Sequence, residues 1–184
     1  EKLILNDICH EMSTCFADLL SDRQVTFIPG DAEQLSFPSG QDLIVSCSAL
    51  QWFVSPELFF KRCNALLSCH GYFAFSTFGK ENLKEIAAVT GSGLHYYSLE
   101  ELKKSLSMHY NIVTAGEERI RLTFATPLDV LYHLKHTGVT AVCRQAWTKG
   151  DLQEFCDKYA KLFSCGNAVT LTYHPLYIIA RKKP

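Results

Sequence analysis

Hydrophobic residues in the first half of the chain form short apolar runs that alternate with segments of helical spacing. The runs are bounded by turn residues, as buried β-strands usually are. The predicted strands are residues 3–6, 25–28, 42–47 and 72–78, and the predicted helices among them are residues 7–20 and 55–69. Strand–helix alternation favours right-handed βαβ units around a parallel sheet. Residues 42–47 are apolar on both faces, so we expect them in a central parallel strand.

Two helix starts are well marked. Ser55, Pro56 and Glu57 supply an N-cap residue, a proline at the first helical position and an acid in the first turn. We expect this helix to stop before Gly71. The four residues 98–101 read Ser-Leu-Glu-Glu, which is a capping box. A helix is therefore predicted from there to residue 108.

The second half of the chain follows a different pattern. The predicted strands are residues 112–115, 119–124 and 168–181, with a possible bend at Pro175, and the predicted helices are residues 127–136 and 150–163. These strands lack full crossover connections, which indicates an antiparallel edge. We predict one α/β domain over residues 1–184, with a helical insertion at residues 126–165 that packs over one end of the sheet.

Composition and charge remove several classes of protein. The net charge of −1 over 184 residues gives no basic field for nucleic acid. The longest apolar runs, residues 42–53 and 72–78, are shorter than the roughly 18 residues of a membrane span. The chain opens on a strand, without a signal-peptide cleavage pattern or an initiator methionine. We expect a cytoplasmic protein without a membrane partner, and an upstream segment that this chain lacks.

The eight cysteines give no metal or disulfide signature. No Cys-x-x-Cys occurs, and the spacing of Cys63 and Cys69 fits no common zinc site. Several cysteines lie within apolar stretches. We therefore expect reduced, mostly buried thiols, as in a cytosolic protein, and no bound metal.

Candidate chemistry lies where the predicted strands end, because ligands of open α/β sheets bind outside the carboxyl ends of the strands. Asp7 follows the first strand, where it either accepts hydrogen bonds from a ribose diol or caps a helix. Asp31 follows the second, where it either accepts from an exocyclic amine or closes an Asx-turn. After the third strand, Gln51 and Trp52 place an amide and a large aromatic ring at the cleft mouth. An isolated tryptophan is also a common packing residue.

These three strand ends, at these spacings, resemble the class I S-adenosylmethionine-dependent methyltransferases. The resembling stretches are residues 3–12, 30–35 and 42–52. The resemblance implies a Rossmann-like, mostly parallel sheet and S-adenosyl-L-methionine as cofactor. It assigns cofactor contacts to Asp7, Ile8, Asp31, Ala32, Cys47, Ser48 and Ala49. By the same resemblance, the glycine-rich loop and the first strand have no counterpart, so residues 3–6 would be the second strand of an N-terminally truncated fold. Cys47 stands where relatives usually have Asn.

Further segments resemble one subfamily, the malonyl-acyl-carrier-protein O-methyltransferases of biotin synthesis. These segments are residues 73–79, 83–85, 98–102, 134–140, 148–152 and 171–174. The resemblance implies methyl transfer to the free carboxylate of a malonyl group on acyl-carrier protein. We expect the substrate side to include Gln51, Trp52, Thr77, Lys135 and Tyr173, with Lys135 on the carboxylate or phosphopantetheine. Lys135 could equally be a solvated lysine on a helix, and Tyr173 a packing residue of a strand. His174 could likewise be structural or functional.

The implied reaction makes modest demands on the protein. A carboxylate acceptor is already ionised near neutral pH, so no general base is needed and no catalytic pair is predicted. Acyl-carrier proteins are acidic as a class, so docking would use a local cationic patch. Candidate pairs are Lys103 with Lys104 and Lys158 with Lys161, although such lysines ordinarily form the solvated face of a helix.

Three other interpretations stay open at this point. The acceptor is a small free carboxylic acid in the first, since such methyltransferases share the Ala-Leu-Gln-Trp stretch. The second is a non-catalytic methyltransferase-like binding module, which the missing glycine loop favours. A nicotinamide-dependent dehydrogenase is the third, and it gives Gln51 and Trp52 no role.

Overall fold

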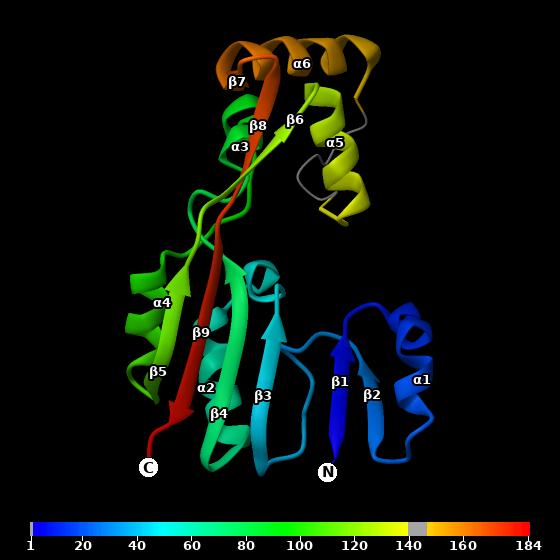
Figure 1. Cartoon of the computed structure of the whole chain (residues 1–184). Helices are drawn as coiled ribbons and strands as arrows, with labels where there is room; N and C mark the ends of the chain where they lie inside the picture. The colour runs from blue at the N-terminus through cyan, green and yellow to red at the C-terminus, as the bar shows by residue number, and fades with distance from the viewer. Residues whose placement is uncertain (1, 140–146) are drawn as a thin grey trace.

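The computed structural model describes residues 2–139 and 147–184 as an elongated molecule with a sheet below and a smaller lobe above (Figure 1). The strands are β1 (Leu3–Asp7), β2 (Val25–Pro29), β3 (Gln41–Cys47), β4 (Leu67–Phe78), β5 (Tyr110–Glu117), β6 (Ile120–Phe124), β7 (Ser164–Cys165), β8 (Ala168–Tyr173) and β9 (Pro175–Lys182). The α-helices are α1 (Ala17–Leu20), α2 (Pro56–Leu66), α3 (Lys84–Thr90), α4 (Leu99–Leu106), α5 (Pro127–His136) and α6 (Lys149–Phe163), and the 3₁₀ helices are η1 (His10–Phe16) and η2 (Leu50–Trp52).

The main sheet has the strand order β3-β4-β9-β5. Strand β3 runs parallel to β4, whereas β9 is antiparallel to both β4 and β5. Its core is built from aromatic and aliphatic side chains of β4, β9, α2 and α4, with Phe73, Leu106 and Leu176 fully buried. The buried Tyr110 hydroxyl donates to the Phe60 carbonyl at 2.8 Å, which ties β5 to α2. The α/β class with parallel strands and an antiparallel edge is confirmed.

Strands β1 and β2 form a separate parallel pair. Within residues 2–139 and 147–184, no ladder joins β1 to β3, so each of these strands has one unpaired edge (Figure 1). Leu43 and Val45 of β3 are 56% and 57% exposed. The expected central position of β3 is therefore wrong for this structure, because a strand is buried only when it has neighbours on both edges and cover on both faces. The absence of a first strand stays a prediction.

The lobe comprises α3, β6, α5, α6, β7 and β8. Its sheet has the order β6-β8-β7, and α3, α5 and α6 pack on it around a second core that includes Val130, Tyr159 and Leu171. The predicted insertion at residues 126–165 covers only part of this lobe. Residues 140–146, which include Thr140 of one resembling segment and Cys143, lie outside the described residues.

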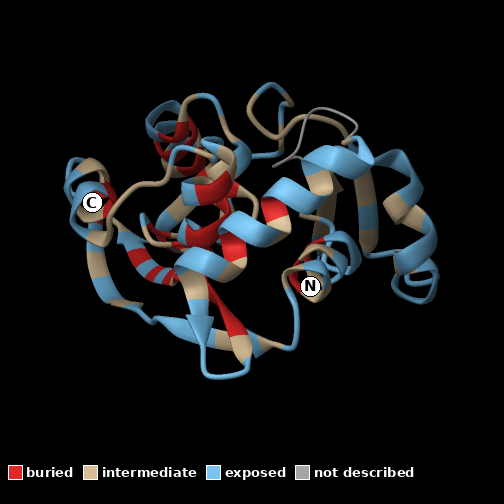
Figure 2. Cartoon of the chain, turned by 90° about the horizontal axis from the view of Figure 1, so that it is seen from above, coloured by how far each residue is buried: buried red, intermediate tan, exposed pale blue. Residues whose placement is uncertain are grey.

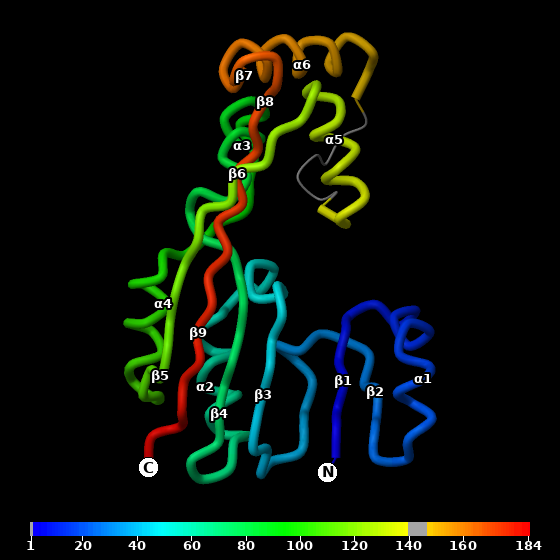
Figure 3. Tube along the Cα trace, in the orientation of Figure 1, coloured from blue at the N-terminus to red at the C-terminus, as the bar shows by residue number. Residues whose placement is uncertain are grey.

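The last long strand is divided between the two sheets. Figure 3 shows the trace running from β8 in the lobe directly into β9 of the main sheet. The prediction of one strand over residues 168–181 is wrong at His174, which pairs in neither ladder. Its backbone N–H donates to the Asn82 side-chain oxygen at 3.2 Å, and its carbonyl accepts from the Gly79 N–H at 2.7 Å.

Several element boundaries differ from the predictions for local reasons. In place of the predicted helix at residues 7–20, the structure has the 3₁₀ helix η1, followed by the single turn of α-helix α1. Helix α2 ends at Leu66, and the Ser55 side chain makes no capping hydrogen bond. Helix α3 was not predicted. The capping box of Ser98 and Glu101 is confirmed, and α5 has its predicted bounds.

Burial is uneven along the chain. Among residues 2–49 none is buried, and the side with β1, β2 and α1, on the right of Figure 1, has no red segment in Figure 2. All seven described cysteines are free, but Cys63 alone among them is buried, so the expectation of mostly buried thiols is wrong. Burial raises the pKa of the Cys63 thiol to about 12. In the described part of the chain, no helix is long and apolar enough to cross a membrane.

Candidate functional site

Asp7 and Asp31 lie at the carboxyl ends of neighbouring strands. Strands β1 and β2 are parallel and in register, with Asp7 opposite Pro29. The Gly30 N–H donates to the Asp7 carbonyl at 2.8 Å, so the turn that carries Asp31 is fastened to the end of β1. The sequence folds this way because Gly30, at a φ of 132°, adopts a backbone conformation that glycine tolerates best. The two carboxylates therefore share one edge of the sheet.

Both aspartates make local hydrogen bonds, but Asp7 is not the predicted helix N-cap, because η1 begins at His10 and its N-cap residue is Cys9. Asp7 Oδ1 accepts from the Cys9 N–H at 2.8 Å. Asp31 Oδ1 accepts from the Glu33 N–H, and Asp31 Oδ2 from the exposed Gln34 side chain, each at 2.8 Å. Asp31 thus closes an Asx-turn, and its second oxygen faces a partner that can move. Cofactor contacts by Asp7, Ile8, Asp31 and Ala32 stay predictions.

The end of β3 is joined to the end of β4. Ser48 takes a left-handed conformation, with a φ of 50°, and its N–H donates to the Ser76 carbonyl at 3.0 Å. The turn carries Gln51 over the buried Thr77, whose hydroxyl donates to the Gln51 side-chain oxygen at 3.2 Å. Two predicted acceptor-side residues, 26 positions apart in the sequence, are therefore in direct contact. Cys47, Ser48 and Ala49 lead into this turn, and their cofactor role stays a prediction.

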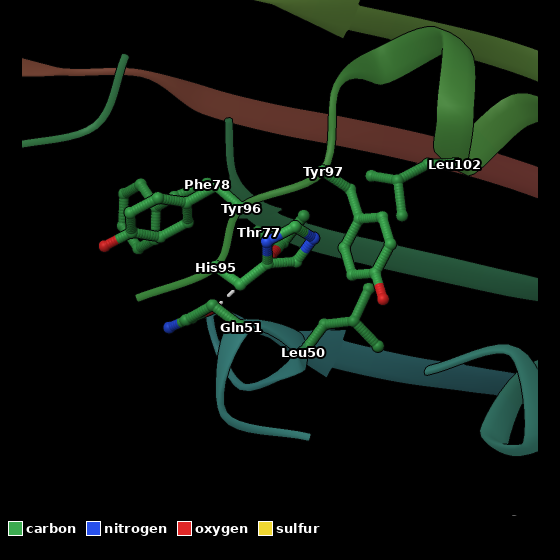
Figure 4. Close-up of a pocket in the computed structure, with 8 residues that line it drawn as sticks. All are labelled: Leu50, Gln51, Thr77, Phe78, His95, Tyr96, Tyr97 and Leu102. Carbon is green, nitrogen blue, oxygen red and sulfur yellow. Dashed lines mark hydrogen bonds between the residues drawn. The ribbon is translucent and has the colours of Figure 1, made fainter. Parts of the chain in front are cut away.

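Gln51 and Thr77 line a small pocket. Its lining residues are Leu50, Gln51, Thr77, Phe78, His95, Tyr96, Tyr97 and Leu102 (Figure 4). The segment before α4 contributes the His-Tyr-Tyr sequence at residues 95–97, which sequence reasoning did not select. The available signal was three aromatic rings in a row immediately before a capping box.

The other predicted acceptor-side residues lie farther apart. Trp52 is 46% exposed and does not line this pocket. Tyr173, at the end of β8, bonds the His133 ring nitrogen at 3.0 Å, and its ring centre lies 6.2 Å from that of Phe78. Lys135 is exposed in the last turn of α5. The structure thus brings Tyr173 near the pocket and leaves the side chain of Trp52 exposed and outside the lining. The substrate roles stay predictions.

His174 has structural partners on every side. It is 3% exposed, its Nδ1 lies 3.1 Å from the Glu81 N–H, and its Nε2 lies 3.2 Å from Glu117. Since a peptide N–H can only donate, Nδ1 is the acceptor and Nε2 carries the hydrogen that Glu117 receives. A Cβ atom at Gly79 would lie 2.6 Å from the His174 ring, so this close approach requires glycine. His174 therefore holds the β4 exit turn against the β8–β9 junction.

A charged cluster surrounds this junction. Arg119 contacts both Glu81 and Glu117, and Lys84 contacts Glu81. Hydrogen bonds from Arg119 and then Lys84 lower the pKa of Glu81 to about 2. The Arg119 guanidinium likewise lowers the pKa of Glu117. The Glu81 side chain is 38% exposed, so solvent screens these pairs and they add little to stability at neutral pH.

The candidate docking lysines lie on two different parts of the molecule. Lys103 pairs with Glu100 on α4, and Lys104 is exposed beside it. Lys158 of α6 donates to the Val89 carbonyl at 2.8 Å, which fastens α6 to α3. This bond gives Lys158 a structural task, and a docking role for any of the four lysines stays a prediction.

Comparison with known proteins first establishes the class. The family model described as "Methyltransferase domain" matches residues 1–75. A crystal structure of a protein from Bacillus halodurans, provisionally described as a methyltransferase, superposes with a TM-score of 0.70 at 16% sequence identity. The superposition covers 100% of this chain and 84% of the Bacillus halodurans chain. At that identity the likeness concerns the fold alone. The family model and the fold together define a methyltransferase domain with the class I fold.

Relatives in the genus Bacteroides narrow the class further. The malonyl-[acyl-carrier protein] O-methyltransferase of Bacteroides thetaiotaomicron is 56% identical over 193 residues, covering 100% of this chain and 74% of the relative. The protein of the same name from Bacteroides fragilis is also 56% identical over the whole chain, which spans 37% of that longer relative. This chain belongs to the malonyl-[acyl-carrier protein] O-methyltransferase family.

Proposed function

We propose that this chain transfers a methyl group to the free carboxylate of malonyl-acyl-carrier protein, an early step of biotin synthesis. The observation that carries the proposal is the 56% identity, over the whole chain, to a relative of that name. That likeness extends through the lobe, beyond the residues of the general methyltransferase model. It therefore includes the part of the chain where acceptor specificity is expected.

The residues present fit S-adenosyl-L-methionine, the methyl donor. Two carboxylates at adjoining strand ends, Asp7 and Asp31, are the acceptor groups that a ribose diol and an adenine amine require. When bound, the cofactor supplies an electrophilic methyl group on a positively charged sulfur. Asp7 would hold the ribose, and Asp31 would hold the base. The turn at Cys47, Ser48 and Ala49 would support the methionine portion.

The chain's residues then have to orient the acceptor and exclude water. A malonyl carboxylate is ionised near neutral pH and is itself the nucleophile, so alignment and desolvation account for the catalysis. Gln51 and Thr77, which fix each other by a hydrogen bond, form one wall beside the exposed Trp52. Lys135 and Tyr173 of the lobe would face the carboxylate or the phosphopantetheine from above.

The acyl-carrier protein would dock through cationic side chains. Lys104 and Lys161 are exposed and are the simplest contributors, with Lys103 close to the first. The cytoplasm is the expected compartment, because fatty-acid carrier proteins act there and thiols stay reduced there.

A binding and turnover experiment tests the proposal. Calorimetry with S-adenosyl-L-methionine is performed on this chain and on a form extended with the segment of the Bacteroides thetaiotaomicron relative outside the aligned region. Methylation is then measured with malonyl-acyl-carrier protein and with free dicarboxylic acids. We expect turnover of the carrier-bound substrate. Turnover of free acids alone would assign the small-acid reaction, and absence of cofactor binding by the extended form would exclude an enzyme.

A further inference from the structure

Asn82 fixes the orientation of a tyrosine hydroxyl next to the Gln51–Thr77 pocket. Asn82 is 5% exposed, and its Oδ1 lies 3.2 Å from the His174 N–H. A peptide N–H can only donate, so the oxygen of the amide must be on that side. The Asn82 Nδ2 group then faces the Tyr96 hydroxyl at 3.1 Å and donates to it.

This bond leaves the Tyr96 hydrogen available. The Tyr96 oxygen is the acceptor toward Asn82, so its own O–H must point elsewhere. Within residues 2–139 and 147–184, no group accepts that hydrogen. Burial raises the pKa of Tyr96 above its usual range, so the hydroxyl stays protonated at neutral pH. A half-buried O–H donor without an acceptor is a ready partner for an oxygen of a ligand.

The position of this hydroxyl suits the acceptor. The Tyr96 ring lines the pocket beside Phe78, and its hydroxyl lies on the side away from Tyr97 and Leu102, at the border of the lining residues (Figure 4). Tyr173 is near enough to raise the pKa of Tyr96 electrostatically, and its ring also contacts Phe78. Neutral phenols from the loop and from the lobe therefore both lie near Phe78.

We propose that Tyr96 is a specificity-determining residue, whose hydroxyl donates to the free carboxylate of the acceptor, and that Asn82 is the positioning residue that turns this hydroxyl outward. The inference rests on the proposed function and deepens it. The Tyr96 hydroxyl can discriminate between ligands, because its hydrogen bond to an ionised carboxylate oxygen is stronger than one to a neutral carbonyl oxygen. Tyr96 would thus favour a malonyl over an acetyl thioester.

The test compares two ligands that differ by the carboxylate. Dissociation constants of malonyl-pantetheine and acetyl-pantetheine are measured by calorimetry on the protein and on Tyr96→Phe. We expect Tyr96→Phe to lower the preference for the malonyl ligand roughly tenfold or more, with affinity for acetyl-pantetheine and S-adenosyl-L-methionine unchanged. A general loosening of the pocket would weaken both pantetheine ligands alike.

Tyr159→Phe is the matched control. Tyr159 is a buried tyrosine of the lobe core whose hydroxyl donates to the Thr170 carbonyl at 2.7 Å, so its loss costs stability without touching the pocket. We expect its ligand preference to equal that of the unsubstituted protein. Asn82→Asp is the second variant, because a carboxylate there would accept the Tyr96 hydrogen and turn it inward. It should lose the preference while the hydroxyl remains.

The outcomes separate this inference from the proposed function. An unchanged preference in either Tyr96→Phe or Asn82→Asp would overturn the inference and leave the proposed function standing. A preference that falls in both variants, in a protein that methylates no malonyl-acyl-carrier protein, would support Tyr96 as a carboxylate donor and overturn the proposed reaction. An unsubstituted protein without any preference for malonyl-pantetheine would overturn both.

Discussion

The β1–β2 pair and the β4–β9 pair are both ladders of apolar strands, yet they differ completely in burial. Phe73 and Ile178, on the β4–β9 ladder, are 0% and 1% exposed. No residue of β1 or β2 is buried, and the helices η1 and α1 beside them contribute none either. Similar strand patterns therefore have different consequences, because burial depends on what packs on both faces and both edges of a strand.

This difference in burial suggests that the strand pair that stabilises the fold is not the pair predicted to bind the cofactor. The two carboxylates predicted to hold the cofactor lie at the end of the weakly packed pair, whereas Thr77 belongs to the well-packed sheet and Tyr96 to the loop before α4. Regions with few buried contacts open at low free-energy cost, and ligand-binding segments often come from them. If Asp7 and Asp31 bind the cofactor as predicted, the β1–β2 pair should gain order when the cofactor binds.

The largest expected effect tests this contrast directly. Phe73→Ala removes a fully buried ring from the main core, and we expect unfolding free energy to fall by about 3–5 kcal/mol. Phe27→Ala, on half-buried β2, is the matched control with an expected loss of about 1 kcal/mol. Urea unfolding monitored by circular dichroism measures both. Equal losses would show that the two ladders are equally important for stability.

A second substitution tests how much the buried hydrogen bonds between Glu85 and Thr172 contribute to stability. Glu85 is 2% exposed, and its carboxylate accepts from the N–H and hydroxyl of Thr172 at 2.9 and 2.6 Å. Glu85→Ala leaves two buried donors unpaired and should cost about 2–4 kcal/mol. Glu85→Gln retains one acceptor and one donor, so its thermal midpoint should stay close to that of the unsubstituted protein. A large loss in Glu85→Gln would instead make the charge essential.

A smaller effect is expected at the cofactor edge. Asp31→Asn keeps the oxygen that receives the Glu33 N–H, while it replaces the oxygen that would accept an exocyclic amine. Affinity for S-adenosyl-L-methionine should fall about tenfold, with the melting temperature of the ligand-free protein unchanged. Calorimetry in a form that binds cofactor measures the affinity. An unchanged affinity would leave Asp31 with its Asx-turn role alone.

The smallest effect concerns pH. The pKa of Glu81 lies at about 2, below its ordinary 4.5, so the folded state binds this proton less readily than the unfolded state. The stabilisation is present above about pH 4.5 and is lost as the pH falls toward 2. Glu81→Gln should flatten the dependence of unfolding free energy on pH within that window, and Arg119→Gln should flatten it in part. Unfolding curves at pH 2–5 with the unsubstituted slope in both variants would contradict this assignment.

Elements specified by local hydrogen bonds were predictable from sequence. Ser98 with Glu101 and Thr126 with Asp129 form capping boxes in the structure, and α4 and α5 begin immediately after those cap residues. Helix α3 has no such signal. Its N-cap residue Leu83 sits at a φ of 52° and makes no capping bond, and the helix is instead held by the distant Thr172.

The candidate site was predictable to the same extent. Parallel strands place their carboxyl ends together, so the strand ends at Asp7 and Asp31, and the contact of Gln51 with Thr77, follow from the order of elements. Tyr96 lies in a loop without periodicity. Its position depends on Asn82, and through Asn82 on the backbone of His174, 78 residues away from Tyr96. Such a chain of contacts leaves no pattern in the sequence.

In the part of the chain that the structure describes, β1 and β3 each have one unpaired edge, and such edges promote self-association. An unpaired strand edge flanked by exposed leucine and valine is a template for the backbone of another molecule. Solutions of this chain should therefore lose monomer by encounters between two molecules, at a rate that rises with the square of concentration. Any segment that fills the space between the two edges would act as an intramolecular solubilising agent as well as a part of the fold.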